Sequence, residues 1–268
     1  MTVRELYEIK KVVEKVEGNL TIPEAFLLYL LAKDISTKGA IVEIGSWKGK
    51  STICLAKGSK SATREKVFAI DPHMGTNEHT TTGILSTLEV FKANIKMSSI
   101  DDWVVPIVMK SEEAICCWRD GIRLLFIDGS HEYSQVKKDL LSWLPKLAPK
   151  GIVALHDSFL GLPGPTNVVL EIVLQNHEFY HVGFIGSITF AGKNPRASSF
   201  EQIRKRLLRM VLAILWRIES RNYDTHNKLV RTHFNFILSL LLNFTSPRVL
   251  HLTLASYSAV LKAFLQNG

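Results

Sequence analysis

The stretch LLFIDGSHEYSQVKKDLLSWLPKLAPKGIVALHDSF, residues 124–159, decides the fold. It begins with an apolar run of strand length, Leu124–Ile127, and ends with another, Ile152–Leu155. Between them, Ser134–Leu147 has helical periodicity, which predicts a strand, a helix and a second strand. Strands joined through a helix run parallel, and continuous apolar strands are typical of a sheet covered on both faces.

The same alternation continues on both sides of this stretch. Further runs of strand length are Ala40–Ile44, Val67–Ile70, Val104–Met109, Val182–Ile185 and Ile188–Phe190. Helical segments are expected after a capping-box signature at Thr21 and over Ser51–Lys57, Ser86–Met97 and Ser111–Trp118. Only the turn Gly186-Ser187 separates the last two strands, so they must pair antiparallel. The sequence therefore predicts an α/β fold with a doubly wound, Rossmann-like sheet of about seven strands, mostly parallel with an antiparallel last strand.

Charge divides the chain near residue 195. The 268 residues carry a net charge of +8. Residues 1–195 hold 22 Lys and Arg against 22 Asp and Glu, whereas residues 196–268 hold 11 against three. The segment Gly192–Ser199 has the composition of a linker. We therefore expect one α/β domain over 1–195, which includes N-terminal helices, and a basic helical C-terminal extension over 196–268.

The cysteine content and the hydropathy of the sequence indicate where in the cell the protein is expected. Three cysteines, Cys54, Cys116 and Cys117, are an odd number, and two of them are neighbours, so a disulfide framework is not expected. The N-terminus lacks the apolar region of a signal peptide, and no run of 18 uncharged apolar residues is present. These features predict a soluble, cytoplasmic protein.

The C-terminal extension has apolar residues at helical spacing, namely Ile203, Leu207, Met210, Val211, Ile214, Leu215 and Ile218. Further helical stretches are expected at Leu229–Phe244 and Val249–Leu265. One interpretation is a helical subdomain that packs on the sheet or forms a homo-oligomer interface. A second is a basic amphipathic helix on the anionic inner face of a membrane. Nucleic acid is not favoured, because the basic residues are not interleaved with aromatic ones.

The first strand ends in a tight glycine turn, Gly45-Ser46-Trp47-Lys48-Gly49. Two glycines at a strand-to-helix turn let a ligand approach the backbone at the start of the next helix. Gly49-Lys50-Ser51 also copies the end of a phosphate-binding P-loop, but only three residues separate the glycines where that motif needs about four. Trp47 also stands where a dinucleotide-binding loop has a glycine, which weakens both phosphate interpretations.

Asp71 follows the second strand, at the position where an acidic side chain commonly binds ribose hydroxyls. An adenosine-type cofactor without a pyrophosphate satisfies both this carboxylate and the glycine turn. S-adenosylmethionine is such a molecule.

Candidate metal ligands and a candidate general base follow the fourth and fifth predicted strands. Asp128 follows one strand, and the pair His156-Asp157 follows the other. Because these strand ends lie side by side in a doubly wound sheet, the three residues are candidate ligands of one divalent cation such as Mg²⁺. His131, three residues after Asp128, has the residue type and position of a general base.

Residues of about 20–195 resemble class I S-adenosylmethionine-dependent methyltransferases, and within them the macrocin O-methyltransferase-like group. The matching stretches are IVEIGSWKGKSTICLA (41–56), VFAIDP (67–72) and the long stretch 124–159. The resemblance implies a seven-stranded sheet with an antiparallel last strand. It also implies cofactor contacts from Glu43, Gly45, Ser46 and Gly49 at the methionine end, Asp71 at the ribose, Ser111 and Glu112 on the adenine side, and Asp128.

The resemblance also assigns roles at the reacting end. In metal-dependent members the position of Asp128 is a ligand, and so is the pair that ends the fifth strand. Here that pair is His156-Asp157, where relatives more often have two acidic or amide residues, so Asp157 is the stronger candidate ligand. His131 matches the position of the base, which is a lysine in catechol-type enzymes.

The leading hypothesis is therefore an S-adenosylmethionine-dependent O-methyltransferase that acts on a hydroxyl of a sugar, a glycolipid intermediate or another small molecule, with metal assistance. Two alternatives remain open at this point. One is a binding or scaffold protein that keeps the fold without turnover, and the other is a phosphate-binding nucleotide enzyme.

Overall fold

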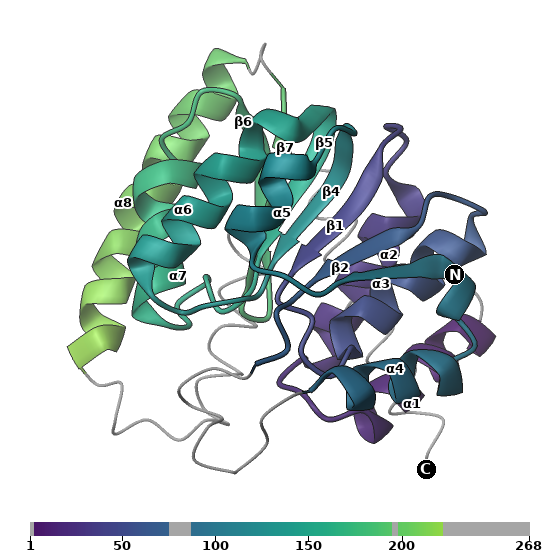
Figure 1. Cartoon of the computed structure of the whole chain (residues 1–268). Coiled ribbons are helices and arrows are strands. Elements are labelled where there is room, and N and C mark those ends of the chain that lie inside the picture. The colour runs from purple at the N-terminus through teal and green to yellow at the C-terminus, as the bar shows by residue number, and fades with distance from the viewer. Residues whose placement is uncertain (1–2, 75–86, 195–197, 222–268) are drawn as a thin grey trace.

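A seven-stranded sheet forms the centre of the computed structural model, which describes residues 3–74, 87–194 and 198–221 (Figure 1). The strands are β1 (Ala40–Ile44), β2 (Val67–Ile70), β3 (Val104–Ile107), β4 (Ile122–Ile127), β5 (Leu147–Leu155), β6 (Phe179–Ile185) and β7 (Ile188–Lys193). Their order in the sheet is β3-β2-β1-β4-β5-β7-β6. The first five are parallel, and β7 pairs antiparallel with both β5 and β6, which confirms the predicted fold class.

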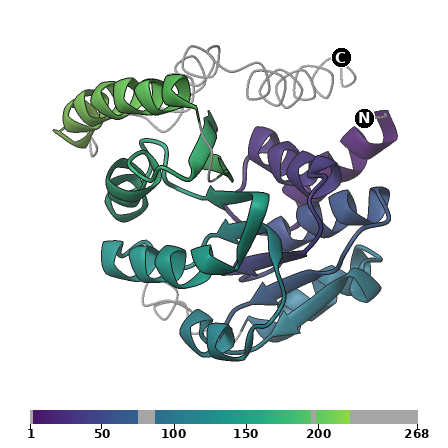
Figure 2. The same cartoon turned by 90° about the horizontal axis from the view of Figure 1, so that it is seen from above.

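Helices cover both faces of the sheet. They are α1 (Val3–Lys15), α2 (Ile22–Asp34), α3 (Lys50–Ser61), α4 (Leu88–Met97), α5 (Ser111–Cys117), α6 (Tyr133–Trp143), α7 (Pro163–Val168) and α8 (Ser199–Arg221). Short helical turns lie at Asp101–Trp103, Leu144–Lys146 and Val169–Val173. One core cluster joins α1–α4 to the sheet, and a second joins α5–α8 to the opposite face (Figures 1 and 2).

The alternation of side chains along β4 explains why the strands are apolar throughout. Leu124 and Phe126 belong to the core cluster under α1–α4, whereas Leu125 and Ile127 belong to the cluster under α5–α8. All four are buried. Each strand residue therefore contacts a helical layer, as expected for a parallel sheet that is covered twice.

Several boundaries differ from the sequence prediction, and two of them lie around Pro145. The helix that was expected to reach Leu147 ends at Trp143, and Leu144–Lys146 form a 3-10 turn that contains the proline. Leu147 instead starts β5, where it pairs with Ile122. β5 is therefore longer than the expected strand Ile152–Leu155, because this pairing with β4 extends it back to Leu147.

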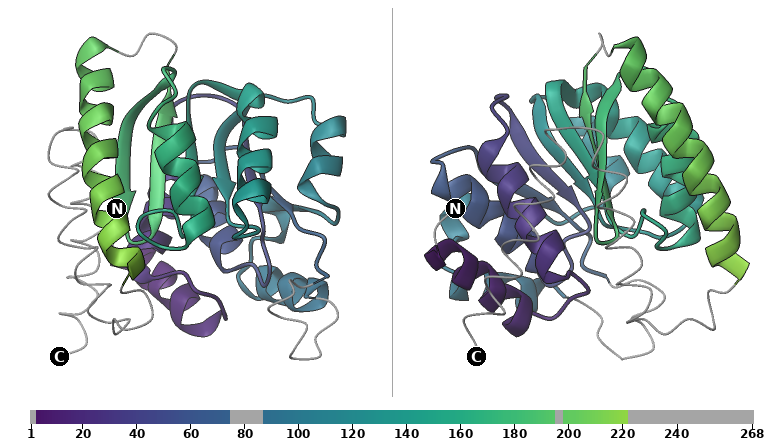
Figure 3. Two further views of the ribbon diagram at one scale, coloured as in Figure 1. Left: turned by 90° about the vertical axis from the view of Figure 1, so that its left-hand side faces the viewer. Right: turned by 180° about the vertical axis from the view of Figure 1, so that it is seen from behind.

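The expected division near residue 195 stays a prediction. α8 packs beside β6, the edge strand of the sheet (Figure 3), and its residues Leu208 and Leu212 are part of the core cluster under α5–α8. The helical stretches expected at 229–244 and 249–265 lie outside the described residues. Among the described residues, no helix combines the length and the apolar character needed to cross a membrane.

Candidate active site

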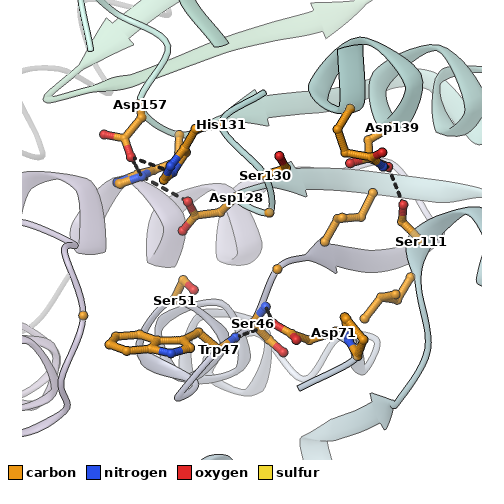
Figure 4. A pocket seen from close by; sticks show the side chains of 18 of the residues that line it. Ser46, Trp47, Ser51, Asp71, Ser111, Asp128, Ser130, His131, Asp139 and Asp157 are labelled. Atoms are coloured by element: carbon orange, nitrogen blue, oxygen red, sulfur yellow. Dashed lines mark hydrogen bonds and ion pairs between the residues drawn. The ribbon is translucent and has the colours of Figure 1, made fainter. Parts of the chain in front are cut away.

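A pocket of about 410 Å³ opens at the carboxyl ends of the parallel strands. This is the edge at which open α/β sheets bind ligands. Side chains that follow β1, β2 and β4 line it, together with residues that follow β5 and residues of α5 and α6 (Figure 4). Its volume falls within the usual range for small-molecule sites.

The glycine turn after β1 forms the floor of this pocket. Gly45 has a φ of +86°, and a Cβ atom there would lie 2.2 Å from the carbonyl oxygen of Asp128, so only glycine fits. Ser46 and Trp47 line the pocket beside it. Trp47 has a φ of +41°, a backbone conformation that bulky residues rarely adopt. Gly49, with a φ of +87°, precedes α3 and is not among the lining residues.

Asp71 holds the turn in place and also faces the pocket (Figure 4). Its Oδ2 accepts hydrogen bonds from the backbone N–H of Ser46 at 2.9 Å and of Trp47 at 2.7 Å. Its Oδ1 accepts the backbone N–H of His73 at 2.7 Å. The structure therefore brings the predicted ribose-binding carboxylate into the pocket and fixes its orientation.

At the reacting end, Asp128, His131 and Asp157 form a cluster that faces the pocket (Figure 4). One ligand atom from each lies within 4.8 Å of the others, which makes the three a candidate site for a cation. His131 Nε2 is 3.5 Å from Asp157 Oδ2. The carbonyl oxygen of His131 would lie 2.0 Å from a Cβ atom on Gly164, so that glycine lets α7 support the histidine loop.

His156, the third predicted metal ligand, is not one of the three residues of this cluster, although it lines the same pocket, so its role as a ligand stays a prediction. His156 is 6% exposed, and its Nδ1 lies 3.1 Å from both Asp128 Oδ1 and Asp157 Oδ2. Asp157 has a φ of +50°, so the chain turns between the two neighbours and only the aspartate joins the cluster. Although burial disfavours the imidazolium, the two carboxylates hold the pKa of His156 well above its ordinary value.

Sequence reasoning assigned Glu24 only to a helix cap, but it also supports this cluster. It is 2% exposed, and its Oε2 accepts the backbone N–H of Thr21 at 2.8 Å and lies 3.8 Å from His156 Nε2. Its Oε1 accepts the backbone N–H of Ser187 at 2.6 Å. Glu24 therefore connects the start of α2, the β6–β7 turn and the buried histidine, a convergence with no signal in the local sequence.

Ser111, at the start of α5, lies at the opposite side of the pocket from this cluster (Figure 4). Its neighbour Glu112 also lines the pocket. Ser111 donates a hydrogen bond to Asp139 of α6, which is 4% exposed. Burial raises the pKa of Asp139. Gln135 also donates to Asp139, at 3.1 Å. Asp139 and Gln135 were missed because their spacing on α6 marks an ordinary helix face.

Glu43 does not line the pocket, although the resemblance places it at the methionine end of the cofactor. It is fully buried in β1 and accepts a hydrogen bond from Thr52 of α3. Burial raises the pKa of Glu43 to about 8. Of the residues expected at the methionine end, Gly45 and Ser46 line the pocket and are available for contact with a ligand, whereas Glu43 is not.

Lys48 of the glycine turn and Lys50, the first residue of α3, both contact the N-terminal part of the chain. Lys50 donates hydrogen bonds through Nζ to the carbonyl oxygens of Val13 at 2.9 Å and Gly18 at 2.8 Å. Lys48 pairs with Glu17 at 2.5 Å. Because the lysine of a P-loop must reach the phosphates, these contacts weigh against the phosphate-binding interpretation. After Asp71 and Pro72, the described residues end at Met74, and His73 Nδ1 lies 2.9 Å from Thr87 Oγ1.

Comparison with known protein sequences gives matches to parts of the chain. Residues 42–158 match the family described as a methyltransferase domain. A segment of 38 residues, 14% of the chain, is 46% identical to an uncharacterized protein of Sinorhizobium fredii, of which it spans 4%.

Solved structures share the fold at low sequence identity. The O-methyltransferase NovP superposes with a TM-score of 0.54 at 16% identity, covering 64% of this chain and 80% of that one. The O-methyltransferase TomG from Streptomyces achromogenes, solved in complex with S-adenosylmethionine, gives 0.52 at 15% identity over 72% and 91%. An O-methyltransferase from Bacillus cereus, in complex with S-adenosylhomocysteine, gives 0.50 at 16% identity over 72% and 92%. Residues 42–158 thus match the description of a methyltransferase domain, and the chain shares the fold of these solved structures.

Proposed function

We propose that this protein transfers a methyl group from S-adenosylmethionine to a hydroxyl oxygen of a small molecule, with sugars and glycolipid intermediates as the first acceptors to test. The observation that carries the proposal is the arrangement of one pocket. Asp71 lies at one part of it, and Asp128, His131 and Asp157 lie at another. The match of residues 42–158 to a methyltransferase domain supports methyl transfer as the reaction class.

The residues present suit the proposed methyl donor. The carboxylate of Asp71 already orders the glycine turn and can accept a ribose hydroxyl as well, because its two oxygens offer about four lone-pair positions. Ser111 and Glu112, which the resemblance assigns to the adenine side, line the same pocket. S-adenosylmethionine supplies a methyl group activated by its sulfonium, and transfer breaks the carbon–sulfur bond to leave S-adenosylhomocysteine.

His131 is the residue we assign to remove the proton of the acceptor hydroxyl. Its side chain is 35% exposed, so an acceptor in the pocket can reach it. When Nε2–H points to Asp157, Nδ1 carries the lone pair that accepts a proton. Asp157 then stabilises the imidazolium that forms. Burial favours the neutral carboxyl, yet hydrogen bonds from His131 and His156 hold the pKa of Asp157 well below its ordinary value.

A divalent cation such as Mg²⁺ fits the same cluster, held by the carboxylates of Asp128 and Asp157, which leaves the imidazole of His131 to accept the proton. Oxygen ligands of this kind suit Mg²⁺ and similar hard cations. There a cation would lower the pKa of the acceptor hydroxyl and fix its position. Calorimetric titration with MgCl₂ tests this: we expect binding heat that Asp128→Asn abolishes and the exposed control Asp102→Asn retains.

Calorimetric titration of the full chain with S-adenosylmethionine, and separately with ATP, tests the proposed function. Micromolar binding of S-adenosylmethionine and none of ATP is expected. Binding of ATP alone would replace the proposal with a phosphate-binding enzyme. Release of S-adenosylhomocysteine is then followed with a panel of polyhydroxyl acceptors.

A variant of the base separates an enzyme from a scaffold protein. We expect His131→Gln to lower the turnover rate by about 10²- to 10⁴-fold, because this is the usual contribution of general base catalysis. Its affinity for S-adenosylmethionine should be unchanged. If the chain binds S-adenosylmethionine but methylates nothing in the panel, and His131→Gln behaves like the parent, the scaffold alternative holds.

A further inference from the structure

α8 presents an apolar face to solvent. Its exposed members are between 41% and 69% accessible: Phe200, Ile203, Leu207, Met210, Val211 and Ile214. These positions recur three and four residues apart, so they form one continuous stripe along the helix. We call these six side chains the α8 stripe. Isolated apolar residues are common on protein surfaces, but an ordered stripe marks a contact surface.

The orientation of the stripe is fixed by the opposite side of α8. Arg204 donates to the carbonyl oxygen of Val182 in β6 at 2.7 Å and pairs with Glu201 at 2.8 Å. Glu201 accepts the backbone N–H of His181 at 2.7 Å. Leu208 and Leu212 are buried in the core cluster under α5–α8. The helix is therefore anchored along the sheet edge (Figure 3), and the stripe lies on its exposed side.

Basic side chains flank the stripe. Arg206, Arg209 and Arg217 are exposed on the same helix. At about 100° per residue, Arg206 and Arg217 lie within about 40° of Met210, at one margin of the stripe. Among the α8 side chains whose exposure is described, the acidic one, Glu201, is 7% exposed and pairs with Arg204. The exposed part of α8 is therefore apolar and positively charged.

We propose that the α8 stripe docks on an anionic lipid surface, with the arginines of its margin against the headgroups. An apolar face beside a basic one is the arrangement of helices that lie in a membrane interface. Charge complementarity selects this occupant over a second copy of the chain. Self-association through the stripe would bring two basic margins to one interface, whereas anionic headgroups neutralise them. The inference does not depend on the proposed methyl transfer.

Flotation of the full chain with vesicles tests the proposal. We expect the protein to float with vesicles of phosphatidylcholine and phosphatidylglycerol, and to remain in solution with phosphatidylcholine alone. Leu207→Ser with Ile214→Ser should lower the bound fraction at least tenfold. Arg206→Gln with Arg217→Gln should weaken binding and reduce its dependence on salt. The matched control is Met97→Ser with Val108→Ser, which removes exposed apolar side chains elsewhere and should bind like the parent.

Three outcomes would overturn the proposal. One is that the full chain does not float with anionic vesicles, or floats equally well with neutral ones. Another is that the stripe variant floats like the parent, which would assign binding to other residues. The third is that the parent forms a dimer by light scattering, does not bind vesicles, and becomes monomeric in the stripe variant. Thermal unfolding checks that each variant folds, which is expected because the replaced side chains are exposed.

Discussion

Replacing Asp71 by asparagine tests the cofactor site most directly. Three backbone N–H groups donate to its carboxylate, from Ser46, Trp47 and His73. Because two carboxylate oxygens offer about four lone-pair positions, about one remains for a ligand hydroxyl. Asparagine keeps the size of the side chain but replaces one acceptor oxygen with an NH₂ group. The variant should therefore lose the hydrogen bond to the ribose.

The size of the effect follows from this single bond. A hydrogen bond to a charged acceptor contributes about 1.5–3 kcal/mol. Since 1.36 kcal/mol corresponds to a factor of ten, Asp71→Asn should weaken binding of S-adenosylmethionine by about 10- to 150-fold. The side chain of Asp71 is 16% exposed, so solvent screens this bond little.

The assay is calorimetric titration with S-adenosylmethionine and with its 2′-deoxy and 3′-deoxy analogues. If Asp71 binds a ribose hydroxyl, the analogue that lacks it should bind the parent and Asp71→Asn almost equally, because the bond is absent in both. Asp102→Asn is the matched control, since this exposed aspartate lies outside the pocket. Additive losses from the substitution and from both analogues would refute the assignment and leave Asp71 only as a support of the glycine turn.

Two further substitutions test the buried charges. Burial raises the pKa of Glu43 to about 8, above its ordinary value of 4.5, so the native state keeps a proton that the unfolded chain releases between these pH values. The free energy of unfolding should thus fall as pH rises, by up to about 1.4 kcal/mol per pH unit. In urea titrations at several pH values, Glu43→Gln should remove this dependence on pH. The same dependence in the parent and the variant would contradict the assignment to Glu43. His156→Leu leaves the carboxylates of Glu24, Asp128 and Asp157 facing each other, so urea unfolding should show a loss of about 2–4 kcal/mol. The exposed control His177→Leu should cost less than about 0.5 kcal/mol, and equal losses would refute the role of His156.

Local patterns predicted the sheet well because each strand carries its own signal. Ala40–Ile44 and Val67–Ile70 are apolar runs bounded by turn residues, and both strands have these limits in the structure. β5 was placed correctly but begins earlier, at Leu147, because pairing with Ile122 overrides the turn preference of Pro149 and Gly151. The presence of a strand is thus determined by its local sequence, whereas its length depends on pairing with a strand that is distant in sequence.

The sequence predicted which residue types lie at the site, but it did not predict how their side chains are arranged in space. Asp128, His131 and Asp157 converge because the ends of adjacent parallel strands meet at one edge. Both members of the pair His156-Asp157 line the pocket, but the cluster contains only Asp157. The sequence gives no sign of this difference, nor of the approach of Glu24 to His156 from a different helix.

The sequence by itself determined the α/β class, the antiparallel end of the sheet and the residue types at the strand ends. These follow from hydrophobic periodicity and from turns too short to permit a crossover, which are properties of neighbouring residues. The tertiary structure was needed to show that Glu43 is buried outside the pocket lining, and that α8 packs through Leu208 and Leu212 while Leu207 and Ile214 face outward. An amphipathic pattern shows that a helix has apolar faces, but which of them is buried depends on the partner surface, here the edge strand β6.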